Sequence, residues 1–140
     1  MNRIEFSASI KQHREGKNIS KYKASKDSGL TEIQIGRIDN AVNSYSIDNM
    51  FLYLKAIGAC IVLSSPVFPN VFKLTSRQDF VKTFKHIRQL NQLSQNKAAY
   101  QIGVNAAIIT GIESRNVDTS VDKFLLCVQG LKYELKIESL

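Results

Sequence analysis

The chain repeats one pattern of apolar and polar positions, and each copy has the spacing of two short helices joined by a turn. In residues 20–40 and 94–114, a Ser is followed by Ala four positions later, Gly nine later and Ile fifteen and eighteen later. An acidic residue comes next, and the copies lie 74 positions apart with no gap. Apolar residues at this spacing predict amphipathic helices, and the Gly between them predicts a tight turn. The sequence therefore predicts a helix-turn-helix unit in each half of the chain.

The same spacing predicts further helices around each unit. In the first half we expect helices over about 3–15, 20–28, 31–40 and 46–57, the last three begun by a Ser or Thr that can cap free N–H groups. Residues 60–63 form a short apolar run of β-branched character, which predicts a strand. The second half repeats this pattern, and in residues 133–138 apolar and charged side chains alternate as in a half-buried strand.

Both prolines of the chain lie in residues 64–76, which predicts a connection between the halves. The expected fold is mainly α, with two tandem domains over residues 1–63 and 77–140. Each domain has four to five helices followed by a short strand. The connection also carries apolar side chains that we expect to be buried against the halves: Val67, Phe68, Val71, Phe72 and Leu74.

Each predicted strand needs a partner, because a lone strand leaves its backbone N–H and C=O groups without hydrogen bonds. Residues 60–63 and 133–138 can pair as an antiparallel ribbon about an internal pseudo-twofold axis, which would make one chain a pseudo-dimer. The strands of two chains can instead pair in a homodimer. The sequence leaves both arrangements open.

Composition favours a polyanionic partner. The net charge is +7, with ten Lys and Arg against six Asp and Glu in residues 1–74, and nine against six in the rest. Because both halves share the excess, neither is a basic tail on a neutral body. No apolar run approaches the roughly 20 residues that span a bilayer, so we expect a cytoplasmic, nucleoid-associated protein without membrane contact. Cys60 and Cys127 lie in apolar segments, which predicts buried reduced thiols and no metal or cofactor.

The repeated frame resembles the helix-turn-helix of phage-repressor and Cro-type proteins, the XRE family. The resemblance covers about residues 4–58 and 78–132 and is closer in the second copy, since the first departs at Ala24-Ser25 and at Asp39. It implies lambda-repressor-like domains that bind double-stranded DNA sequence-specifically. The implied role is that of a transcriptional regulator of the repressor type.

The resemblance also implies which residues contact DNA. The helices at 31–40 and 105–114 would enter the major groove, where Arg37 can hold O6 and N7 of guanine together and Asn105 suits adenine. The base-reading residues implied are Thr31, Glu32, Ile33, Gly36 and Arg37, and in the second copy Asn105, Ala106, Ala107, Thr110 and Gly111. The start of the second helix and the loop after the third should contact phosphates, which implies Lys21, Asn40 and Asn43, and Gln95, Arg115 and Asn116.

Each copy also contains a candidate ion pair. Arg14 precedes Asp39 by 25 residues, and Arg88 precedes Glu113 by the same 25. In similar family members an Arg of the first helix pairs with the acid that ends the third, which implies that these four residues brace the motif. Removing one member of such a partly buried pair is costly, so the implied roles are structural and not catalytic.

Enzymatic activity is not expected. His13 and His86 stand 73 positions apart with no Cys or carboxylate cluster at ligand spacing, and the sequence has no Gly-rich phosphate loop or nucleophile elbow. The competing hypothesis is a protein-interaction module of the same fold, such as an antitoxin-like partner binder with weak DNA binding. The second recognition face favours it, because alanines offer only small apolar contacts to bases.

Overall fold

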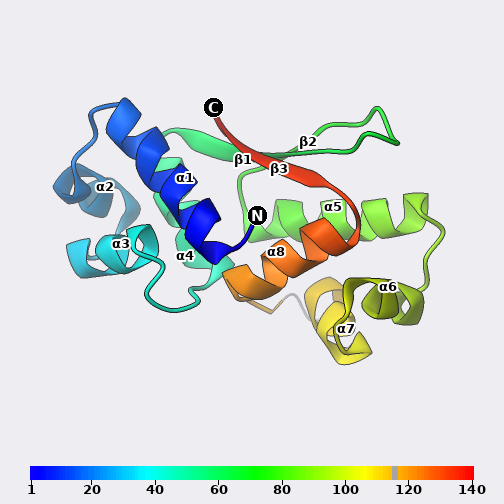
Figure 1. Cartoon of the computed structure of the whole chain (residues 1–140). Helices are drawn as coiled ribbons and strands as arrows, with labels where there is room; N and C mark the ends of the chain where they lie inside the picture. Colours follow the sequence, from blue (N-terminus) through cyan, green and yellow to red (C-terminus); the bar gives the residue numbers. More distant parts are fainter. Residues whose placement is uncertain (115–116) are drawn as a thin grey trace.

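The computed structural model describes residues 1–114 and 117–140, which form a mainly helical protein with one small sheet (Figure 1). Four helices precede β1, and four more precede β3. In chain order the elements are α1 (Arg3–Gly16), α2 (Lys21–Ser28), α3 (Glu32–Asp39), α4 (Ile47–Ala56), β1 (Ala59–Ser64), β2 (Phe72–Leu74), α5 (Arg77–Leu90), α6 (Gln95–Ile102), α7 (Ala106–Ser114), α8 (Val121–Gly130) and β3 (Glu134–Ser139).

Ser and Thr side chains begin the helices at the predicted positions. Ser20 and Thr31 are the N-caps of α2 and α3, and each side chain accepts a hydrogen bond from the backbone N–H three residues later. Ser46, Ser94 and Ser120 cap α4, α6 and α8 in the same way. Each cap satisfies one of the N–H groups that have no partner within the helix.

Two glycines end the helices that precede the predicted turns. Gly29 and Gly103 have φ of 81° and 88°, in the left-handed region. Residues with a Cβ adopt this conformation at a cost, whereas Gly does not. The chain can therefore turn sharply from α2 into α3 and from α6 into α7.

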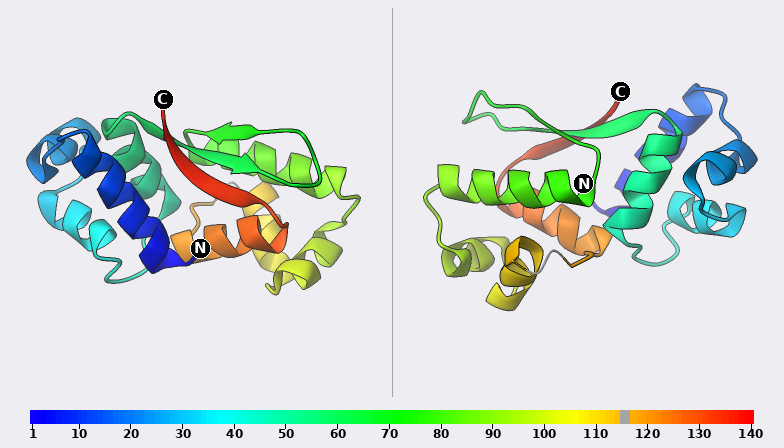
Figure 2. Two further views of the ribbon diagram at one scale, coloured as in Figure 1. Left: turned by 45° about the horizontal axis from the view of Figure 1, so that its top comes forward. Right: turned by 180° about the vertical axis from the view of Figure 1, so that it is seen from behind.

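The sheet has the order β2-β1-β3, and neighbouring strands are antiparallel. β1 is the central strand and is buried along nearly its whole length. Its register with β3 pairs Ile61 with Ile137, and Val62 with Lys136. The two strands predicted at 60–63 and 133–138 therefore pair within one chain, and Figure 2 shows them side by side.

β2 was not predicted from the sequence and lies in the segment predicted as a connection. Leu74 is buried and Phe72 is half-buried, but Val67 and Val71 are 75% and 61% exposed. The expectation that all the apolar side chains of this segment are buried is therefore wrong. Pairing with β1 orients Phe72 and Leu74, whereas the two valines lie in the irregular loop before β2.

One hydrophobic core runs through both halves of the chain. Phe124 of α8 packs against Phe6 of α1 and Phe80 of α5, with ring centroids 6.5 Å and 4.8 Å apart. All three side chains are buried. Because α1 precedes the connection and α8 follows it, the halves share one apolar interior.

Backbone contacts join the halves at the start of α4 and α8. Ser46 and Ser120 form an isolated antiparallel bridge. On either side of it, the Ile47 N–H donates to the Thr119 carbonyl at 2.8 Å, and the Val121 N–H donates to the Tyr45 carbonyl at 2.7 Å. These bonds lie at the opposite side of the helices from the sheet (Figure 1).

Two ion pairs also link the halves. Arg3 Nη1 lies 2.6 Å from Asp122 Oδ2, and Arg77 Nε lies 3.1 Å from Asp48 Oδ1. Partly exposed pairs like these add little stability.

No helix in residues 1–114 or 117–140 has the length and apolar character needed to cross a membrane. Both cysteines are buried free thiols, as predicted.

Candidate nucleic-acid interface

The two faces of α3 have opposite character. Ile35 and Ile38 are buried in the core, whereas Glu32, Ile33 and Arg37 are exposed. Ile33 is 71% exposed, so its side chain contributes little to the packing of the domain. The exposed face of α3 therefore offers an acid, an apolar side chain and a guanidinium to a partner.

A capping box fixes the start of α3. Thr31 Oγ1 accepts from the Gln34 N–H at 3.1 Å, and the Gln34 side chain accepts from the Thr31 N–H at 2.8 Å. These reciprocal bonds hold the first turn of the helix, where the predicted base readers begin. The role of Gln34 was not predicted, although Thr followed three residues later by Gln is the usual sequence signal of a capping box.

The residues predicted to contact phosphate in the first copy lie around α3. A Cβ built at Gly36 would lie 3.8 Å from Lys21 Nζ, so the ammonium group of Lys21 rests beside the half-buried Gly36. Asn40 and Asn43 are exposed beyond the C-terminus of α3. Arg37 and Asn43 both line a hollow of about 300 Å³. Arg37 therefore shares this hollow with Asn43, one of the predicted phosphate contacts.

A buried network holds α3 against α1 and α4. Arg14 Nη2 donates to Asp39 Oδ2 at 2.9 Å, Nε donates to the Tyr53 hydroxyl at 2.8 Å, and Nη1 donates to the Ile19 carbonyl at 2.8 Å. The Tyr53 hydroxyl in turn donates to Asp39 Oδ1 at 2.6 Å. Burial and the bond to Asp39 raise the pKa of Tyr53, so the hydroxyl remains a donor. Each hydrogen-bonding atom of this charged pair has a partner, which limits the cost of burying it.

The second copy makes the equivalent contact without a tyrosine. Arg88 holds Glu113 through two bonds of 2.7 Å, and its Nη1 donates to the Leu93 carbonyl at 2.8 Å. Cys127 stands 74 positions after Tyr53, and its burial raises the pKa of the thiol to about 12. The longer side chain of Glu113 accepts from both Nε and Nη2 of Arg88, whereas Asp39 accepts only from Nη2 of Arg14.

The base-reading face predicted in the second copy is less exposed than the one predicted in the first. Asn105 and Ala107 are exposed, Ala106 and Thr110 are half-buried, and Gly111 is buried. Asn105 Oδ1 accepts from the Ala107 N–H at 2.8 Å, so part of its hydrogen-bonding capacity is used within the helix.

The side chain of Gln95 also forms its hydrogen bonds within its own unit. Its side-chain nitrogen donates to Glu113 at 3.4 Å, and its oxygen accepts from the Thr110 hydroxyl at 3.2 Å. The predicted phosphate contacts Arg115 and Asn116 lie outside the described residues. Among the described members of the second predicted set, Asn105 and Ala107 are therefore the exposed ones.

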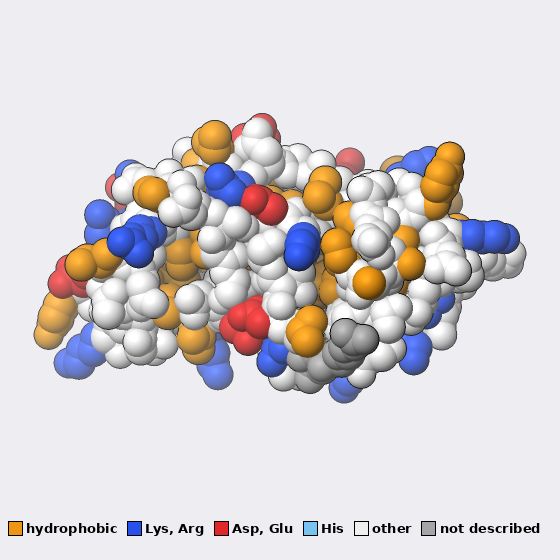
Figure 3. All heavy atoms as spheres, turned by 90° about the horizontal axis from the view of Figure 1, so that it is seen from below, with side chains coloured by type: hydrophobic (Ala, Val, Ile, Leu, Met, Phe, Trp, Pro, Cys, Tyr) orange, Lys and Arg blue, Asp and Glu red, His pale blue; other side chains and the backbone are white. Residues whose placement is uncertain are grey.

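Positive charge distinguishes the two units. α2 carries the exposed Lys21, Lys23 and Lys26, and α3 adds Arg37, whereas α6 has only Lys97 and α7 has no Lys or Arg in its described length. Figure 3 views the side opposite the sheet, where Lys and Arg side chains are scattered over the face, its margin and both ends without forming one patch. The first unit is therefore the better match for a phosphate backbone.

Within residues 1–114 and 117–140, no group of three or more His, Cys, Asp and Glu side chains could hold a metal ion. Comparisons of the chain with protein-family models, with curated proteins and with solved structures give no match.

Proposed function

We propose that this protein is a tandem helix-turn-helix regulator of the phage-repressor and Cro type, which binds double-stranded DNA sequence-specifically and acts as a repressor. The main support for this proposal is the exposed face of α3, with Glu32, Ile33 and Arg37. A capping box and a buried ion pair hold this helix in place. A rigid helix with a free polar face and flanking cations suits insertion into a major groove.

In this proposal each exposed residue of α3 has a distinct role. Arg37 donates both arms of its guanidinium to a guanine, Glu32 accepts from a cytosine amino group, and Ile33 contacts a thymine methyl. Lys21, beside Gly36, contacts phosphate and fixes the depth of the helix in the groove.

We further propose that the halves form a pseudo-dimer within one chain. Under the shift of 74 positions, the bridge from Ser46 to Ser120 maps onto itself, as does the pairing of Val62 with Lys136. The bond from Ile47 to Thr119 maps onto the bond from Val121 to Tyr45, and the Arg3–Asp122 pair maps onto Arg77–Asp48. Contacts that exchange in this way are those expected about a twofold axis. They support an internal axis over a homodimer that uses the same strands.

A pseudo-dimer with unequal recognition helices predicts an asymmetric operator. Two half-sites should lie about one helical turn, roughly 34 Å, apart on the same side of the duplex. The half-site at α3 should be the more strongly specified, because Arg37 has no counterpart among the exposed residues of α7.

The first test is selection of bound sites from random duplexes by the intact chain, followed by titration of the selected duplex. Affinity should fall steeply between about 50 and 200 mM salt, because cations released from the DNA accompany binding. Arg37→Ala should weaken binding roughly 5- to 150-fold and relax the preference at one base pair. Lys136→Ala removes the same charge from the exposed face of β3 and is the matched control. If no duplex binds at low salt, or if both variants behave alike, the proposal is wrong.

A second candidate function is binding of a protein by α6 and α7. It is favoured by one observation, the 91% exposure of Tyr100 on α6 beside an α7 that carries no cation. This role predicts a stoichiometric complex that survives Arg37→Ala and Lys21→Ala but is weakened by Tyr100→Ala. Neither DNA selection nor salt titration would then give a signal.

A further inference from the structure

The two edges of the strand pair formed by β1 and β3 differ. The outer edge of β1 is covered by β2, which pairs with it through Phe72, Lys73 and Leu74. The outer edge of β3 has no strand beside it in the described chain, because the sheet has the order β2-β1-β3. An open edge exposes backbone donors and acceptors that can pair with another strand.

One hydrogen bond shows which backbone N–H and C=O groups of β3 point toward the open edge. The Leu140 N–H donates to the Gly58 carbonyl at 2.9 Å, so Leu140 faces β1. Backbone groups alternate along a strand, so Lys136 and Glu138 also face β1, whereas Leu135 and Ile137 direct their N–H and C=O groups outward. These outward groups correspond, 74 positions later, to those of Ile61 and Leu63, which pair with β2.

A groove runs beside this open edge. Between α1 and β3 it has a volume of about 620 Å³ and is lined by Ser9, Gln12 and His13 together with Leu135 and Ile137. His13 Nε2 lies 3.4 Å from the Ser139 hydroxyl at one end. Gln12 is the counterpart of His86 in the repeat, and Phe72 of β2 packs edge-on against the ring of His86 at 5.7 Å. The groove thus lies where a strand equivalent to β2 would rest on α1.

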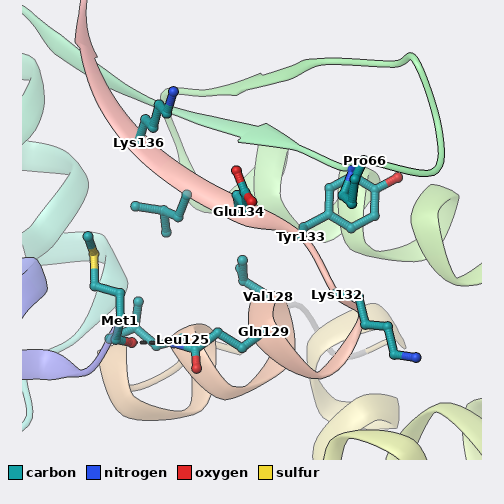
Figure 4. A pocket seen from close by; sticks show the side chains of 10 residues that line it. Met1, Pro66, Leu125, Val128, Gln129, Lys132, Tyr133, Glu134 and Lys136 are labelled. Atoms are coloured by element: carbon teal, nitrogen blue, oxygen red, sulfur yellow. Dashed lines mark hydrogen bonds between the residues drawn. The ribbon is translucent and has the colours of Figure 1, made fainter.

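The groove continues between β3 and α8. This part has a volume of about 510 Å³, with Leu125 and Val128 of α8 facing the strand, Met1 at one end and Lys132 at the other (Figure 4). Leu125 and Val128 line the part beside α8. The part beside α1 combines Leu135 and Ile137 of β3 with the polar side chains of α1, so a strand placed at the edge could bury its inward side chains against these two apolar residues.

The charged side chains on the exposed face of β3 determine which sequence of a partner strand would pair favourably with it. Glu134, Lys136 and Glu138 are exposed and alternate in sign. Within the described residues, none of the three has an ion-pair partner. Cross-strand neighbours of opposite charge stabilise a pair of strands, and like charges destabilise it. A complementary strand therefore places an acid opposite Lys136 and bases opposite the two glutamates.

We propose that the open edge of β3 binds an extended peptide segment of a partner protein, as a fourth strand antiparallel to β3. The segment carries the pattern basic–apolar–acidic–apolar–basic, with its apolar side chains directed into the groove against α1. A second copy of this chain is a poorer occupant, because joining two β3 edges would bring both α1 helices into the space beneath the paired strands.

The test uses the capped peptide Lys-Phe-Glu-Leu-Lys, which keeps the two apolar residues of β2 and complements β3. Titrated into isotopically labelled protein, it should shift the amide signals of Leu135, Ile137 and Ser139 and those of Gln12 and His13. The charge-reversed peptide Glu-Phe-Lys-Leu-Glu should bind about tenfold more weakly or not at all.

Reversing the strand should reverse the preference. The triple variant Glu134→Lys, Lys136→Glu, Glu138→Lys changes only exposed side chains, and it should favour the charge-reversed peptide by a similar factor. The inference is overturned if both peptides bind equally, if shifts fall outside this edge, or if no shift occurs. It is also overturned if sedimentation shows self-association and the β3 amides shift with protein concentration alone. A DNA-binding defect in the triple variant is not expected, so failure here leaves the proposed function standing.

Discussion

At the scale of single residues, the two buried ion pairs meet one geometric requirement with different side chains. In each pair, Nε and Nη2 of the arginine donate hydrogen bonds and need acceptors. Arg14 and Arg88 occupy the same position in the repeated sequence pattern. Glu113 accepts both bonds alone, whereas Asp39 is one methylene shorter and shares them with Tyr53. The shorter acid at 39 thus goes together with a tyrosine at 53, and the longer acid at 113 with a cysteine at 127. The sequence shows this relation only when both positions are compared between the halves.

The hydroxyl of Tyr53 should therefore contribute to stability in addition to the packing of its ring. Tyr53→Phe leaves Arg14 Nε and one oxygen of Asp39 without partners, and we expect a loss of about 1–3 kcal/mol in the free energy of unfolding. Asp39→Ala isolates a buried guanidinium and should cost about 3–5 kcal/mol. Urea denaturation measures both. Tyr22→Phe removes the same hydroxyl at a 64% exposed position and serves as control. Equal stabilities for the Tyr53 and Tyr22 variants would contradict this account.

At the scale of elements, the turn between α2 and α3 depends on backbone conformation alone. A Cβ at Gly29 would meet no atom within 4 Å, but its φ of 81° is unfavourable for any other residue. We expect Gly29→Ala to destabilise the protein by about 1–2 kcal/mol. Gly16→Ala has equal space and no positive φ, so its stability should stay the same or rise slightly. Thermal unfolding of the two variants gives the comparison. A neutral Gly29→Ala would show that the turn tolerates another conformation.

Helix positions could be predicted from sequence because capping residues and apolar spacing are local signals. Thr31 and Gly29 mark the ends of α3 and α2 without reference to the rest of the chain. β3 was predictable for the same reason, since its alternation is visible in the sequence. β2 was not, because a three-residue strand has too few positions to show alternation, and its pairing with β1 is a tertiary event.

The candidate site was less predictable than the fold. Arg37 and Ile33 are exposed because Ile35 and Ile38 take the inner face of α3, and this follows from helical spacing. Helical spacing does not predict that the side chains of Gln95 and Thr110 hydrogen-bond to each other within the unit. This arrangement depends on Glu113, a residue that only the folded unit brings within reach of Gln95.

At the scale of the whole molecule, the contacts between halves are too extensive for independent folding. β1 and β3 pair along six residues, and Phe124 joins the aromatic side chains of α1 and α5. Each half of about 65–70 residues is near the size at which a core is marginal on its own. The halves should therefore unfold together, although each contains four helices of its own.

This cooperativity can be tested with Phe124→Ala, which removes the ring at the centre of the shared core. We expect a loss of about 3–5 kcal/mol, and hydrogen exchange in rising urea should show the slowest amides of α1 and α4 and those of α5 and α8 losing protection together. Leu126→Ala, on the same helix but 49% exposed, should cost under about 0.5 kcal/mol. If Phe124→Ala lowers protection in α5 and α8 while α1 and α4 keep theirs, the halves are separate folding units. A fixed spacing between α3 and α7 on DNA would then lose its structural basis.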